Sequence, residues 1–152
     1  MLSRQASHAL KALLELAAHP SQWQSTHALA QTQQLPEPML EQLLLRLRRH
    51  GLLVARRGRQ GGYQLARPAR EISLAAVLAG LGEGAALQWG DIGMSPTVGQ
   101  EVSPADQVTE ALQRRLERAR LKALEDLSLE DLLFDLRSAE ASANSEAGLL
   151  LG

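Results

Sequence analysis

The fold of this chain is decided by residues 36–68, PEPMLEQLLLRLRRHGLLVARRGRQGGYQLARP. Two prolines flank Glu37, and the first turn of a helix tolerates proline because its N–H groups have no partner there. Leucines then recur every three or four residues, which predicts a helix to about His50 with one buried face. These leucines are Leu40, Leu43, Leu44 and Leu47. Gly51 suits the position just past the helix end.

The second half of this stretch predicts a β-hairpin. Residues 52–57 and 63–67 have the composition of two short strands, and the loop between them, residues 58–62, is rich in glycine and basic. Upstream, the periodic apolar residues Ala6, Leu10, Leu13, Leu14 and Ala17 predict a helix over residues 3–18. Ser25 can cap a short helix over residues 27–33. Three helices followed by a two-stranded hairpin is the element order of a winged helix-turn-helix domain.

The rest of the chain predicts more helix. Ser73 can cap a fourth helix to about Leu81, and a glycine-containing loop then runs to about Val102. A long helix is predicted from the cap at Ser103 to Asp126, and a last helix ends near Arg137. The long helix carries a narrow apolar seam, which favours packing against another helix. The seam is Val108, Leu112, Leu116, Ala119 and Ala123.

The expected fold class is therefore mainly α with a small β-hairpin, a winged helix-turn-helix domain plus a long dimerisation helix. The expected organisation is a DNA-binding domain over residues 1–82, a sensor-type loop over 83–102, dimerisation helices over 103–137 and a loosely held C-terminal tail over 138–152. An aromatic content of only 3% agrees with a core built from Leu and Ala.

Composition excludes several classes of site. The chain has no cysteine, which excludes disulfides, thiolate zinc sites and cysteine-ligated clusters. No nucleophile–base pair, phosphate loop or metal motif occurs, so we expect no enzyme and no cofactor. No apolar run reaches membrane-spanning length and the start lacks the layout of a signal peptide, so we expect a soluble, cytoplasmic protein without membrane contact.

Charge divides the chain in two. Residues 1–70 contain 10 Lys and Arg against 3 Asp and Glu, whereas residues 71–152 contain 6 against 14. A basic first half predicts binding to a polyanion, and in this element order the polyanion is double-stranded DNA. Arginines of the hairpin can neutralise phosphates, and its glycines allow a close approach of the backbone. The residues assigned to DNA contact are Glu41, Gln42, Arg46, Arg56, Arg57, Gly58, Arg59, Gly61, Gly62 and Tyr63.

The order of these motifs resembles the Rrf2 family of bacterial winged-helix transcription regulators. The resemblance rests on residues 40–43, Leu47-Arg48, Gly51-Leu52, Arg57-Gly58, residues 61–67 and residues 72–74, with weaker matches at 109–112 and 128–132. It implies a homodimer on a palindromic promoter site, with Glu41 reading a base and Arg57 entering the minor groove. Relatives usually have small or hydroxyl residues where this chain has Pro36 and Pro38, which implies a different recognised sequence. The cluster-binding members carry three cysteines in the loop, and this chain has none there.

Two hypotheses follow for a regulator without that cluster. The first is a sequence-specific DNA-binding homodimer whose signal is an effector ligand or a partner protein. The second is a protein-interaction module derived from such a regulator, which binds an acidic partner in place of a specific operator. The residues alone do not decide between repression and activation.

Overall fold

Serine caps and leucine stripes set the limits of the N-terminal helices. The hydroxyls of Ser3, Ser25 and Ser73 each accept a backbone N–H of the first helical turn, at 3.0–3.1 Å. The computed structural model describes residues 2–83 and 102–150. The helices of its first part are α1 (Arg4–Ala18), α2 (Thr26–Gln33), α3 (Glu37–Arg49) and α4 (Leu74–Gly80), with a short 3-10 turn η1 (Ala69–Glu71).

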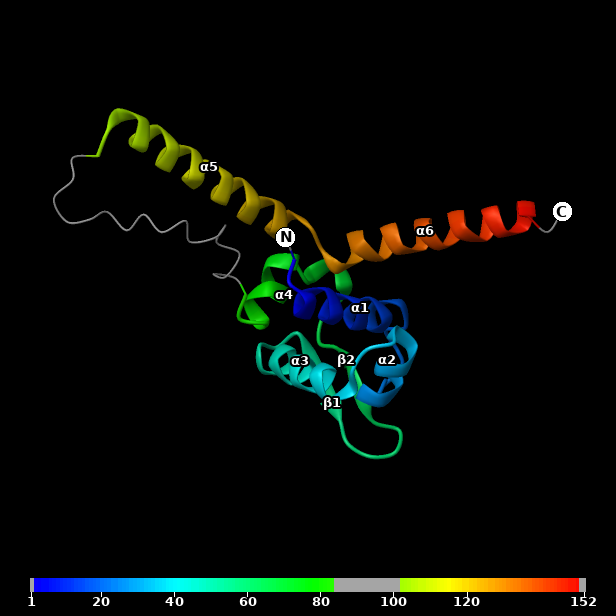
Figure 1. Ribbon diagram of the computed structural model, residues 1–152. Helices are drawn as coiled ribbons and strands as arrows, with labels where there is room; N and C mark the ends of the chain where they lie inside the picture. Colours follow the sequence, from blue (N-terminus) through cyan, green and yellow to red (C-terminus); the bar gives the residue numbers. More distant parts are fainter. Residues whose placement is uncertain (1, 84–101, 151–152) are drawn as a thin grey trace.

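A two-stranded antiparallel hairpin lies between α3 and η1. It consists of β1 (Leu53–Arg56) and β2 (Gly62–Leu65), with Leu53 opposite Leu65 and Arg56 opposite Gly62. Its loop forms the tip of the molecule farthest from α5 and α6 (Figure 1). The helices and strands predicted for residues 2–83 are present, with ends that differ by one or two residues.

The core of this part is built from aliphatic side chains. The predicted stripe of α3 is fully buried, and in the predicted stripe of α1 only Leu14 is half-buried. Ile72 and Leu129 join the same cluster from outside these helices, each with no exposed surface. The cluster therefore holds the hairpin and α3 in a fixed relation, because both contribute leucines to it.

The two last helices leave this core in opposite directions (Figure 1). They are α5 (Pro104–Asp126) and α6 (Leu129–Leu150). Their junction is tied to the start of α4 by two backbone hydrogen bonds, from Leu74 N–H to the Leu127 carbonyl at 2.8 Å and from Leu129 N–H to the Ile72 carbonyl at 2.9 Å. Leu129 and Leu133 are buried, so the first turns of α6 pack on α1 and η1.

The prediction that the last helix ends near Arg137 is wrong, because α6 continues to Leu150. Small polar residues were expected to be loosely held beyond that point. Alanine has the highest helix propensity, and it alternates with serine and acidic residues in this segment. Three serine hydroxyls also bond to carbonyls four residues earlier within α6, each at 3.0 Å. These serines are Ser138, Ser142 and Ser145.

The predicted cap of α5 is confirmed, and α6 begins with a cap of the same kind. Ser103 and Asp106 form a reciprocal capping box at α5, and Ser128 and Asp131 do the same at α6. The predicted sensor-type loop falls almost wholly on residues 84–101, outside the described residues. Within residues 2–83 and 102–150, no helix combines the length and the apolar character that crossing a bilayer requires.

Candidate nucleic-acid interface

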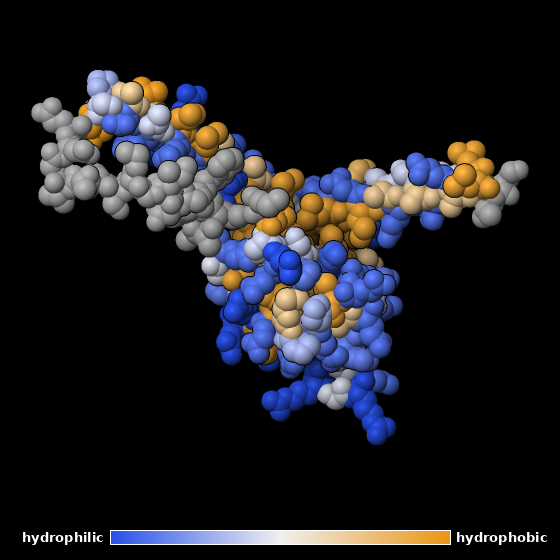
Figure 2. Space-filling view, viewed as in Figure 1, coloured by the Kyte–Doolittle hydropathy of each residue, from blue (hydrophilic) through white to orange (hydrophobic). Residues whose placement is uncertain are grey.

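The arginines of the hairpin project into solvent. Arg56 ends β1, and Arg57 and Arg59 follow in the loop, all three with exposed side chains. Figure 2 shows hydrophilic side chains reaching out from this tip of the molecule. None of these three arginines forms an ion pair with an acid among the residues that the structure describes. Their charge is therefore available to an anionic partner.

A third segment completes the hairpin, and sequence reasoning missed it. Gln24 pairs with Tyr63 through two backbone hydrogen bonds, from Tyr63 N–H to the Gln24 carbonyl at 2.8 Å and from Gln24 N–H to the Tyr63 carbonyl at 3.2 Å. The pairing fixes β2 against the start of α2. The exposed loop is thereby held at both strands, because β1 is paired with β2 along its whole length.

Two glycines are required by close backbone contacts of the hairpin. A Cβ at Gly62, where φ is +143°, would lie 2.4 Å from the Gln24 carbonyl, and a Cβ at Gly61 would lie 2.1 Å from the Arg56 carbonyl. Gly61 and Gly62 are therefore required by close approach within the protein. Gly58 has φ +107° and nothing within 4 Å of such a Cβ, so its backbone faces open space.

The ring of Trp23 contacts the guanidinium of Arg56. The guanidinium carbon of Arg56 lies 5.8 Å from the centre of the Trp23 ring, within the range of a cation–π contact. The contact restricts the side chain of Arg56, whereas Arg57 and Arg59 have no such support among the described residues. A tryptophan in a short polar connector was the available sequence signal for this role.

The hairpin and two helices enclose a basic cleft of about 340 Å³, the wing cleft. Its lining includes the N-terminal end of α2 at Ser25 and Thr26, and Arg48 of α3. Arg48 was not among the predicted contact residues. The predicted residues that line the cleft are Arg56, Arg57, Gly58, Arg59, Gly61, Gly62 and Tyr63.

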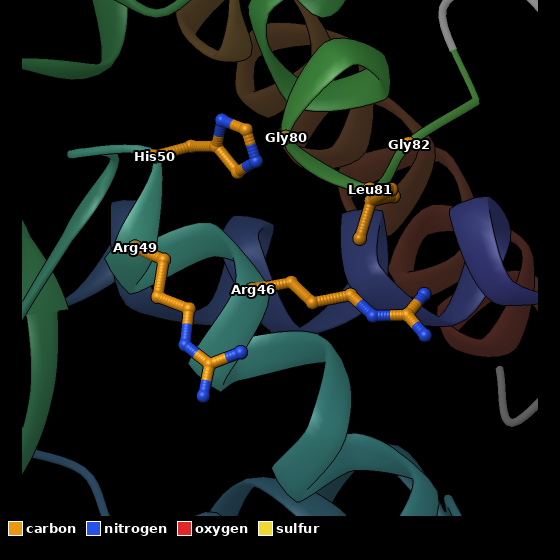
Figure 3. Close-up of a pocket in the computed structure, with 6 residues that line it drawn as sticks. All are labelled: Arg46, Arg49, His50, Gly80, Leu81 and Gly82. Carbon is orange, nitrogen blue, oxygen red and sulfur yellow. The ribbon is translucent and has the colours of Figure 1, made fainter.

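The predicted residues of α3 divide between two faces. Glu41 and Gln42 are both exposed, and Glu41 shares a face with Arg48 because seven residues make about two helical turns. Arg46 lies on another face, where it lines a separate pocket with Arg49 and His50 (Figure 3). The structure thus brings the hairpin residues together and places Arg46 apart from them.

The apolar seam of α5 has no cover within the described chain. Val108, Leu112 and Leu116 are 69%, 53% and 59% exposed, and Ala119 and Ala123 are exposed as well. An exposed stripe of this length on one helix marks an interaction surface. Figure 2 shows hydrophobic residues along both long helices and at the place where they meet the body.

The donor set of the chain does not fit an iron centre of the cysteine-ligated kind. No thiolate is available anywhere in the sequence, and the four histidines, at positions 8, 19, 27 and 50, precede the loop. Among the described residues, no three His, Asp or Glu side chains come together as a metal site would need.

Comparison with known sequences gives relatives of one kind. A protein of Synechocystis sp., named provisionally as the HTH-type transcriptional regulator slr0846, is 40% identical over 143 residues, which are 93% of this chain and 92% of that protein. The HTH-type transcriptional regulator IscR of Cereibacter sphaeroides is 40% identical over 80 residues, 51% of this chain and 52% of that protein. These relatives are regulators, and this chain is not an enzyme.

Solved structures agree with the sequence relatives. IscR of T. potens superimposes with a TM-score of 0.70 at 29% identity, over 91% of this chain and 90% of that chain. CymR, the global cysteine regulator of B. subtilis, superimposes with a TM-score of 0.69 at 28% identity, over 88% of this chain and 95% of that chain. The Rrf2 family, described as iron-dependent transcriptional regulators, matches residues 2–135. Although its donors do not fit the cysteine-ligated iron of some members, the chain belongs to the Rrf2 family of DNA-binding transcriptional regulators.

Proposed function

We propose that this protein is a sequence-specific DNA-binding regulator that acts as a homodimer on a palindromic promoter site. The observation that carries the proposal is the wing cleft, where Arg48, Arg56, Arg57 and Arg59 converge from α3 and the hairpin without acidic partners among the described residues. Several guanidiniums around one cleft suit a phosphate backbone.

Contacts to the bases would come from the exposed start of α3. In a winged helix-turn-helix domain the recognition helix enters the major groove, and the wing lies against the backbone or the minor groove. Glu41 can accept a hydrogen bond from cytosine N4, and Gln42 can bind adenine in a bidentate way. Arg57 stands at the wing tip and would enter a narrow minor groove, where the negative potential attracts arginine.

A palindromic site requires two copies of the reading domain in fixed relation. The uncovered seam of Val108, Leu112 and Leu116 on α5 supports pairing of two chains along this helix. The proposed organisation thus keeps a DNA-binding part over residues 1–82 and a pairing part that begins at residue 103. The signal is an effector ligand or a partner protein, since the donors for a cysteine-ligated cluster are missing.

Fluorescence anisotropy with promoter fragments, including the fragment upstream of the protein's own gene, tests the proposal. Arg57→Ala is expected to weaken binding to the preferred fragment by about 1–3 kcal/mol and to relax sequence preference. Arg70→Ala is the matched control, because Arg70 is exposed in η1 and lies outside the wing cleft. Binding with no preference over competitor DNA would favour a protein-interaction module, and an unchanged affinity of Arg57→Ala would remove this residue from the interface.

A further inference from the structure

A second basic pocket lies where α3 and α4 both end, apart from the wing cleft. This α3–α4 pocket has a volume of about 330 Å³ and is lined by Arg46, Arg49, His50, Gly80, Leu81 and Gly82 (Figure 3). It shares no lining residue with the wing cleft. The volume lies at the lower end of the range of small-molecule sites in proteins.

The two helix ends are held together by packing. A Cβ at Gly80 would lie 3.5 Å from the Cβ of His50 and 3.4 Å from a methyl group of Leu47, so the two chain segments are in direct contact. α4 ends in a left-handed glycine, Gly82 with φ +77°, and the Glu83 N–H bonds to the Leu78 carbonyl at 2.9 Å. These contacts fix the backbone of the pocket before any ligand arrives.

The basic side chains of the pocket have no acidic partner in the described chain. No ion pair there involves Arg46, Arg49 or His50. The carboxylate of Glu83, which follows the lining residue Gly82, accepts the hydroxyl of Ser3. Two guanidiniums and an imidazole are therefore gathered around a pocket with no carboxylate in its lining.

Hydrogen bonding to the last carbonyls of α3 does not account for this gathering of charge. Cations are common in the last turn of a helix because they complement its dipole and its free carbonyls. In α3, however, backbone N–H groups already serve these carbonyls, from His50 to Arg46 at 3.1 Å, from Gly51 to Arg48 at 3.0 Å and from Leu52 to Leu47 at 3.0 Å. The side chains of Arg46 and Arg49 remain free to bind something else.

We propose that the α3–α4 pocket binds a small oxyanion, with the phosphate group as the chemistry that fits it best. A guanidinium binds phosphate through two parallel N–H donors, and Arg46 and Arg49, which both line the pocket, carry one such group each. His50 adds a ring N–H. The anion can come from a phosphate-bearing metabolite or from the DNA backbone, and the two sources make different predictions.

Isothermal titration calorimetry of the full chain with inorganic phosphate, at constant ionic strength balanced by chloride, tests the site without any DNA. We expect the wild type and the control Arg67→Gln/Arg70→Gln to bind phosphate equally, and Arg46→Gln/Arg49→Gln to bind at least tenfold more weakly. Both double variants remove two exposed arginines and keep the helical or turn backbone, and circular dichroism verifies that they fold. No binding by the wild type, or equal binding by all three proteins, overturns the proposal.

Binding of a non-specific duplex over a range of salt concentrations then identifies the source of the anion. If the DNA backbone occupies the pocket, Arg46→Gln/Arg49→Gln makes the negative slope of log K against log salt shallower by about two. Each of the two arginines that no longer neutralises a phosphate contributes about one. If a free metabolite occupies it, the slope stays at the wild-type value while the variant fails to bind phosphate. Because the calorimetry needs no DNA, failure of this site and failure of the proposed DNA interface are separate results.

Discussion

Replacement of Gly62 by alanine tests the account of the wing most directly. Gly62 combines a φ of +143° with a backbone approach so close that a Cβ would lie 2.4 Å from the Gln24 carbonyl and 2.7 Å from the Ser25 nitrogen. All of these neighbours are main-chain atoms, so they cannot rotate aside as a side chain would. The alanine methyl can be accommodated only if β2 moves away from Gln24.

The expected cost follows from two contributions. A backbone conformation that L residues rarely adopt costs about 1–3 kcal/mol. Separation of β2 from Gln24 removes the two hydrogen bonds between Gln24 and Tyr63, each worth about 0.5–1.5 kcal/mol. Gly58→Ala carries only the first contribution, because Gly58 has φ +107° and open space around it. Gly62→Ala is therefore expected to be less stable than Gly58→Ala by about 1–3 kcal/mol.

Urea unfolding followed by circular dichroism measures this difference, provided that the slope of the free energy against urea is the same for both variants. Gly148→Ala serves as a further control, because a Cβ there meets nothing within 4 Å on an exposed helix, and it should be neutral or slightly stabilising. Equal stability of Gly62→Ala and Gly58→Ala would refute the argument that close approach to Gln24 requires this glycine.

Three further outcomes are expected. Leu129→Ala should cost about 2–5 kcal/mol in urea unfolding, because this fully buried side chain joins α6 to the core, and a cost below about 1 kcal/mol would contradict that role. Hydrogen bonds from the Ser128 N–H and hydroxyl hold the pKa of the Asp131 carboxyl below its usual value. The wild type should therefore be more stable than Asp131→Asn above about pH 4, and this advantage should disappear as the pH falls through the lowered pKa. Thermal unfolding from pH 7 to pH 2.5 measures it. Leu112→Glu should shift the chain from dimer to monomer in sedimentation velocity, whereas Gln113→Glu, the same charge one position along, should not; a dimeric Leu112→Glu protein would exclude the seam.

Local patterns were enough to predict the helices that carry the core. The leucine spacing of α3 and the serine caps of α2 and α4 depend on residues within one or two turns, and these predictions are confirmed. The prediction of where α6 ends was wrong, because small polar residues are as common in tails as on the surface of an exposed helix. The alanines at 139, 141, 143 and 147 were the signal that favoured helix there.

Contacts between distant segments could not be predicted. The pairing of Gln24 with Tyr63 and the contact of Trp23 with Arg56 join residues more than thirty positions apart, and neither leaves a periodic pattern. The requirement for Gly62 follows from the pairing with Gln24, and that for Gly61 from the close approach of the hairpin loop to the Arg56 carbonyl. The sequence therefore suggested a role toward DNA where the structure shows a need inside the protein. Arg48 was missed for the same reason, since only the folded hairpin shows which face of α3 turns toward it.

The two backbone hydrogen bonds at the junction of α5 and α6 have a consequence for how such regulators diverge. They join main-chain atoms of residues 72, 74, 127 and 129, so substitutions of exposed side chains along α5 leave them unchanged. If two chains pair through α5, the distance between their DNA-reading domains would then be set by the backbone geometry of this junction. Substitutions along α5 could alter how tightly two chains associate, or with which chain, while the spacing of the half-sites on the promoter stayed the same.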